Sequence, residues 1–244
     1  MHALCTTRAG GQSRAPYNAL NLGDHVGDDP ASVAANRAIL RQAMPAKPVF
    51  LNQVHGTHAM LLTPGTPDAT QADACFTAQP QLACTIMVAD CLPVLLTNKK
   101  GSVVAAAHAG WRSLAGQGGL GILEQVYKAF MPLEHTSTTR EATEIIAWLG
   151  PCIGPTAFEV GPDVRDAFLA SDPLAQTLFV PKPNGKWLAN LQGLARRRLA
   201  ALGISEIYGN DGSADWCTVS QPSRFFSHRR DGVSGRMAAC IWLD

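Results

Sequence analysis

The most regular feature of the chain is a series of short, nearly continuous apolar runs that begins around residue 48. Short apolar runs between turn signals are typical of strands that are buried on both faces of a sheet. The pattern predicts strands at residues 49–54, 59–62, 83–88, 93–97, 102–108, 144–149, 204–208 and 237–243.

Four other segments carry apolar residues at helical spacing. They lie at residues 31–44, which follow Pro30, and at 118–130, 162–170 and 187–202. Residues 6–30 are rich in Gly, Asn, Asp and Pro and predict a loop. Because the strands and helices do not alternate regularly and no change of composition marks a linker, the sequence predicts an α+β fold in a single domain, residues 1–244.

The composition narrows the possible partners. The chain has 244 residues, of which 46% are hydrophobic and 16% are charged, and this is typical of a soluble globular protein. Its formal net charge of +1 provides no long-range field for nucleic acid or for an anionic membrane, so we expect neither as a partner. An anionic substrate must therefore be attracted by a few local arginines.

The cysteines and the apolar runs together indicate a cytoplasmic location. Seven cysteines, an odd number with no Cys-x-x-Cys pair, predict reduced thiols rather than a disulfide framework. The first residues lack the basic and then apolar pattern of a signal peptide. The apolar runs are also too short to span a bilayer.

Three residues that can bind a metal lie where predicted strands end, beside Gly or Pro. They are His55, Cys91 and His108. Two imidazoles and one thiolate suit Zn²⁺ and leave its fourth tetrahedral position open for water or substrate. In such a site Zn²⁺ lowers the pKa of its water to about 7. His58 would point to the opposite face of a strand from His55, so we interpret it as structural.

The segments around these residues resemble one protein family over nearly the whole chain. Its signature blocks match NQVHG at 52–56, ADCLP at 89–93, HAGWR at 108–112 and GPCIG at 150–154. Its terminal blocks match TRAGG at 7–11, LNLG at 20–23, HVGD at 25–28 and FFSHRRDG at 225–232. The family was long labelled multicopper polyphenol oxidase or laccase-like, and is now described as purine nucleoside phosphorylase.

The resemblance implies a zinc ion held by His55, Cys91 and His108. It also implies phosphorolysis of adenosine, inosine and methylthioadenosine, together with adenosine deamination, so a nucleoside and phosphate are the expected partners. Some members of the family are linked to quality control of peptidoglycan precursors. The implied fold has central mixed sheets packed as a sandwich and flanked by helices.

The older laccase label does not fit the histidine content. A multicopper oxidase needs many histidines, commonly in His-x-His pairs, whereas this chain has seven histidines and no such pair. We therefore expect no multicopper site. Cu²⁺ can still replace Zn²⁺ in vitro, because it binds nitrogen and sulfur ligands more tightly.

The expected catalytic residues are the three ligands and Asp90, the carboxylate next to Cys91. Asp90 could move protons during deamination, or could simply cap the end of a strand. Phosphorolysis requires a phosphate site, and the planar guanidinium of arginine bonds phosphate oxygens in pairs. The candidates are Arg112, Arg8, Arg229 and Arg230, each with the alternative role of a surface ion-pair residue.

Two other functions are compatible with the same residues. A metal-free hydrolase or amidase could use Cys91 as the nucleophile and His108 as the base. A non-catalytic regulator of cell-wall precursor quality would act by binding alone. The arginine triplet at 196–198 lies on a predicted helix, and we expect it on the solvated face.

Overall fold

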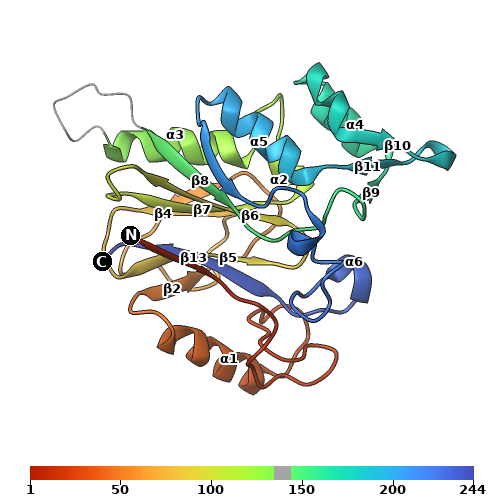
Figure 1. Cartoon of the computed structure of the whole chain (residues 1–244). Helices are drawn as coiled ribbons and strands as arrows, with labels where there is room; N and C mark the ends of the chain where they lie inside the picture. The colour runs from red at the N-terminus through yellow and green to blue at the C-terminus, as the bar shows by residue number, and fades with distance from the viewer. Residues whose placement is uncertain (135–143) are drawn as a thin grey trace.

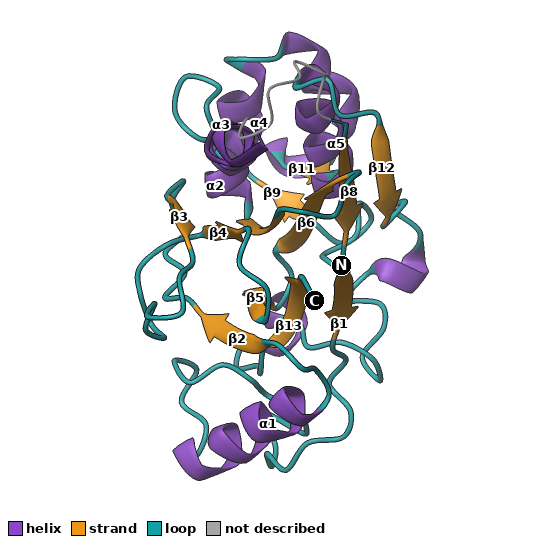
Figure 2. Cartoon of the chain, turned by 90° about the vertical axis from the view of Figure 1, so that its left-hand side faces the viewer, coloured by secondary structure: helices purple, strands orange, loops and turns teal. Residues whose placement is uncertain are grey.

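Two mixed β-sheets face each other in the centre of the molecule, and helices cover their outer faces (Figures 1 and 2). The computed structural model describes residues 1–134 and 144–244. It confirms the expected α+β fold and the sandwich of sheets flanked by helices.

The larger sheet has six strands in the order β12-β8-β6-β7-β4-β3. Their bounds are Glu206–Gly209, Ile145–Leu149, Leu92–Asn98, Val104–Ala109, Ala74–Thr77 and Ala59–Leu61. The smaller sheet has the order β1-β13-β5-β2, with bounds His2–Cys5, Met237–Trp242, Leu82–Val88 and Lys47–Phe50. A third sheet, β10-β11-β9, lies at one side and consists of Phe179–Pro181, Trp187–Ala189 and Glu159–Val160.

The side chains of the strands alternate between distinct apolar layers, as the twofold period of a strand requires. In β5, Cys84 and Ile86 pack between the two central sheets, whereas Ala83 and Met87 pack toward the outer helix α1, Pro30–Gln42. The outer face of the larger sheet packs against α3, Ile122–Glu134, and α5, Leu191–Ala201. Figure 1 shows α3 and α5 above the larger sheet and α1 below the smaller one.

The remaining helices are short and lie in the connections between strands. Three are α-helices, namely α2 at Trp111–Ala115, α4 at Pro162–Leu169 and α6 at His228–Asp231. Three are 3₁₀ helices, namely η1 at Pro173–Leu178, η2 at Pro183–Gly185 and η3 at Ala214–Trp216.

The structure corrects the start of two predicted helices. The segment predicted as a helix at 187–202 begins as strand β11, and the helix starts only at Leu191. Asn190 is the reason, because its side chain accepts a hydrogen bond from the Gly193 amide and caps the helix there. The helix predicted at 118–130 begins at Ile122, because Gly118 and Gly119 have positive φ.

In the central sheets, β1 and β4 were not predicted, and the strand predicted at 49–54 ends at Phe50. The strands of the third sheet were not predicted either. The arginine triplet also differs from the expectation. Arg198 is mostly buried, and its guanidinium bonds the Glu124 carboxylate and the carbonyls of Ala115 and Gly119. Arg196 bonds two backbone carbonyls, so the triplet ties α5 to its neighbours instead of facing solvent alone.

Candidate metal centre

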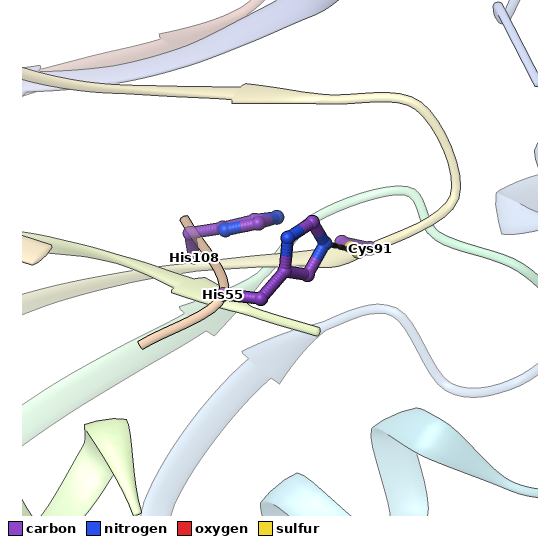
Figure 3. A group of neighbouring side chains, drawn as sticks. All are labelled: His55, Cys91 and His108. Carbon is purple, nitrogen blue, oxygen red and sulfur yellow. Dashed lines mark hydrogen bonds between the residues drawn. The ribbon is translucent and has the colours of Figure 1, made fainter. Parts of the chain in front are cut away.

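The three predicted ligands converge at one end of the sandwich. One ligand atom from each of His55, Cys91 and His108 lies within 4.8 Å of the others. The His55 Nε2 atom is 3.6 Å from the Cys91 sulfur, and the two imidazole centroids are 4.7 Å apart at an angle of 66°. Figure 3 shows the three side chains pointing toward one another. His108 is buried, Cys91 is half-buried and His55 is exposed.

The pairing of β6 with β7 brings two of the ligands together. Cys91 immediately precedes β6, and His108 lies in β7 opposite Pro93. His55 comes from the loop after β2, where it adopts a positive φ of 60°. Gly110 leaves the space that these side chains need, since a Cβ there would lie 2.8 Å from His55 Cδ2 and 3.0 Å from the Cys91 sulfur.

A buried carboxylate that the sequence analysis missed lies directly behind the ligands. Asp73 has no solvent exposure, and its Oδ1 is 2.9 Å from His108 Nδ1. The same carboxylate accepts hydrogen bonds from the amides of Val54, His55 and Gly56. The only signal in the sequence was an acidic residue at the start of an apolar run, and that signal alone does not indicate a site.

In the metal-free cluster, Cys91, His108 and Asp73 shift one another's pKa values. Burial opposes ionisation of the Cys91 thiol, but the neighbouring His108 and His55 outweigh it and lower the pKa of the thiol to about 6. Burial likewise disfavours a charged His108, but Cys91 and Asp73 raise the pKa of the imidazole to about 9. The pKa of Asp73 is lowered against its burial by His108 and by backbone amides.

The donor set fits a metal ion of intermediate softness. A thiolate and two imidazoles are the ligands that Zn²⁺ and Cu²⁺ both accept, and three protein ligands leave a coordination position open. Within the described residues, this is the one group of three His, Cys, Asp or Glu side chains whose ligand atoms converge in this way. The cluster could therefore hold one metal ion, whose identity the donor set alone does not fix.

The cluster opens into a cavity of about 410 Å³. A cavity of this size takes a small molecule, and its mixture of apolar walls and a few polar groups is usual for such sites. The apolar wall is formed by Met87, Val88, Trp111, Ile153, Phe158 and Leu191. The polar groups, besides the cluster, belong to His25, Gln53, Asp90, His228, Arg229 and Arg236.

Of the four predicted phosphate-binding arginines, only Arg229 lines this cavity. Its guanidinium bonds the Glu159 carbonyl and lies 5.6 Å from the centroid of the Phe158 ring. Arg112 lies over the Trp111 ring and faces a neighbouring cavity of about 640 Å³, which shares His55 and Trp111 with the first.

Arg8 and Arg230 do not line either of these two cavities. Arg8 bonds the carbonyls of Asn18 and Pro222. Arg230 bonds Asp231 and the carbonyl of Thr218. Both side chains therefore tie loops together in this structure.

Asp90 lies at the cavity, but both of its carboxylate oxygens are engaged. Oδ1 is 2.5 Å from the Thr218 hydroxyl, and Oδ2 is 2.6 Å from the Arg229 amide. Asp90 therefore holds the segment of Arg229 against the site. A part in proton transfer stays a prediction.

Four polar cavity residues were not among the predicted site residues, namely His25, Gln53, His228 and Arg236. Arg236 is half-buried and donates to the carbonyls of Ser234 and Gly235. Burial lowers the pKa of its guanidinium, against the opposing influence of Cys91 and Asp90. Arg236 directly precedes the apolar run of β13, and only this position at a strand end could have indicated it.

The fold and the centre define an α+β protein with a His/Cys/His cluster in a ligand-sized cavity. The model of the family described as multi-copper polyphenol oxidoreductase laccase matches residues 2–244, so the chain belongs to that family. Among the described residues, no second group of metal-binding side chains accompanies the cluster.

Similar proteins carry a different functional name. A protein of Haemophilus influenzae named purine nucleoside phosphorylase is 44% identical over 100% of this chain and 95% of its own length. One of Escherichia coli K12 with the same enzyme name is 47% identical over 99% of this chain and 93% of its own. A solved Neisseria meningitidis structure, 45% identical, has a TM-score of 0.86 over 99% of this chain and 93% of its own.

No helix in the described part of the chain is both long enough and apolar enough to cross a membrane.

Proposed function

We propose that the protein is a zinc-dependent purine nucleoside phosphorylase that acts on adenosine, inosine and methylthioadenosine. The observation that carries this proposal is one cavity in which the His/Cys/His cluster, an apolar wall and two arginines meet. The enzyme name shared by two relatives that match over 95% and 93% of their length supports the same reaction.

The cavity offers a separate place for each part of the reaction. A purine is a flat, largely apolar group, and Phe158, Ile153 and Leu191 provide a matching wall. Phosphate is an anion, and Arg229 and Arg236 are the cationic side chains at the cavity. We therefore propose that these two arginines bind phosphate. Arg112 could reach the same substrate only from the neighbouring cavity, across Trp111.

The metal ion would be held by His55, Cys91 and His108 and would supply positive charge beside the substrate. The protein's own residues do the rest of the positioning. The apolar wall excludes water from the purine, and Asp90 holds the Arg229 segment in place through the Arg229 amide. We also propose adenosine deamination as a side activity. In that reaction Asp90, the carboxylate closest in sequence to the ligands, would move protons.

The proposal is tested by product analysis with inosine and adenosine, in the presence and absence of phosphate. We expect phosphate-dependent release of hypoxanthine and adenine. Changing Arg229 or Arg236 to Gln should raise KM for phosphate about tenfold or more, because each charged hydrogen bond contributes roughly 1.5–3 kcal/mol.

Arg224→Gln is the matched control, since Arg224 is exposed, lies over Phe225 and does not line the cavity. Base release that does not depend on phosphate, or an equal loss in Arg224→Gln, would count against the proposal.

A cysteine hydrolase is the second candidate, and one observation favours it. Cys91, His108 and Asp73 form a thiol–imidazole–carboxylate series of the kind that activates a nucleophile. The hydrolase would work without metal and would be inactivated by alkylation of Cys91. A phosphorylase that depends on the metal would lose activity on chelation and regain it when zinc is restored.

A further inference from the structure

Asp73 contacts two of the three candidate ligands at once. Its side chain is fully buried, binds the His108 ring and accepts the backbone amide of His55. We infer that Asp73 is a positioning residue that preorganises the metal centre, because it selects the ring nitrogen that His108 presents to the metal and fixes the loop that carries His55.

The first part of the inference concerns the His108 ring. The Asp73 Oδ1 atom lies 2.9 Å from Nδ1, and an ionised carboxylate can only accept a hydrogen bond. Nδ1 therefore keeps its proton, and Nε2 is the nitrogen that can give up its proton and bind the metal. Metal-binding histidines generally donate their other ring N–H to such a partner, which fixes both the tautomer and the orientation of the ring.

The second part concerns the loop that carries His55. Three consecutive amides, those of Val54, His55 and Gly56, donate to the Asp73 carboxylate at 3.2, 2.9 and 2.7 Å. His55 has a φ of 60°, a conformation that a residue with a side chain seldom adopts without support. The carboxylate provides this support, so the exposed imidazole of His55 stays close to the Cys91 sulfur.

The backbone of the same residue joins the two ligand segments. The Asp73 carbonyl accepts the His108 amide at 2.7 Å, and the Asp73 amide donates to the carbonyl of His58 at 3.0 Å. Residue 73 therefore links the His55 loop to β7 independently of its side chain. A change of the carboxylate alone should accordingly alter the centre more than it alters the fold.

The experiment measures metal affinity in the absence of nucleoside. Wild-type protein, Asp73→Asn and Asp68→Asn are stripped of metal and titrated with Zn²⁺ in competition with a chromophoric chelator. Asp68 is the matched control, because it also accepts a buried backbone amide, that of Phe50, but contacts no ligand. Circular dichroism checks that each variant is folded.

We expect Asp73→Asn to bind zinc about 10–100-fold more weakly than the wild type, the usual effect of losing such a partner. Asp68→Asn should bind as the wild type does. Cobalt-substituted Asp73→Asn should also show an altered cobalt–thiolate absorption band. Equal zinc affinity in all three proteins would overturn the inference.

A measurement on the wild type keeps the test valid if Asp73→Asn does not fold. Nitrogen-15 spectra of the zinc-loaded protein should show His108 with its proton on Nδ1 and the metal on Nε2. Coordination through Nδ1 would overturn the inference. The inference rests on the metal centre of the proposed function, yet neither readout involves turnover, so its failure is distinguishable from failure of the phosphorylase proposal.

Discussion

The side chains of the centre are packed closely enough that a single methyl group should disturb them. Gly110 adopts an ordinary φ of −70°, so its role is to leave space rather than to permit an unusual backbone. Its missing Cβ would overlap His55 and crowd the Cys91 sulfur. Sequence alone placed this glycine beside a ligand, but only the fold shows which side chains occupy the space.

Gly110→Ala should therefore weaken zinc binding at least tenfold, because His55 and Cys91 cannot keep their present positions. The overall stability should change little, since Gly110 caps α2 with extended φ and ψ values that Ala also adopts. Competition with a chelator measures the affinity. Gly65→Ala is the control, because a Cβ at residue 65 meets no atom within 4 Å. Unchanged zinc affinity in Gly110→Ala would contradict this account of the packing.

Cys91 should be the reactive thiol of the metal-free protein. With a pKa of about 6, its thiolate is already the main form at pH 7, and protonation below pH 6 should slow alkylation by iodoacetamide. Cys152 should not react, because burial raises the pKa of its thiol. Mass spectrometry locates the label. Zinc should protect Cys91, and labelling that ignores both pH and zinc would refute the prediction.

At the scale of elements, the sequence pattern located the strands that are buried on both faces. β5, β6, β7 and β13 are continuous apolar runs and were predicted to within two residues at each end. β4 was missed because Asp73 precedes a run of only four residues, and β11 because its apolar residues continue the helical spacing of α5. In both cases the pairing partners in space decide the structure, and the sequence does not show them.

The ligand set, in contrast, was predicted from the sequence, because each ligand lies in a recognisable block of residues. The cavity residue Arg236 could not be predicted in this way, and His25 lies in the block HVGD without any sign in the sequence that this loop reaches the site. They reach the site from a loop and from the segment before β13, and only the closed sandwich brings these to the strand ends that carry Cys91 and His108.

Arg198 should make a large contribution to the packing of α5. Its guanidinium is mostly buried with the Glu124 carboxylate, so Arg198→Ala leaves a charge and two carbonyls without their partner. We expect a loss of about 2–3 kcal/mol in the free energy of unfolding, measured with urea.

The neighbouring Arg197 provides the matched comparison for Arg198. Arg197 pairs with Asp172 where both side chains are about one-third exposed, so Arg197→Ala should cost less than about 1 kcal/mol. Equal losses in the two variants would show that burial of the Arg198 pair is not what matters.

At the scale of the whole molecule, the two central sheets and their helices leave the His/Cys/His cluster, the candidate metal centre, at one end of the sandwich. The middle core layer is formed by residues of both sheets, and we therefore propose that residues 1–244 form one domain. The layers position the strand ends, where β7 itself provides His108 and the neighbouring loops provide His55 and Cys91. This arrangement explains how ligands from three separate segments can form one centre.

The central claim is that the metal held by His55, Cys91 and His108 is required for phosphorolysis of purine nucleosides. The most direct measurement strips the protein of metal, adds zinc in known amounts and follows phosphate-dependent base release from inosine at each step. Activity should rise in proportion to bound zinc and level off at about one ion per chain, as expected for a single three-ligand site. Full phosphorolysis in protein shown to contain no metal would contradict the claim.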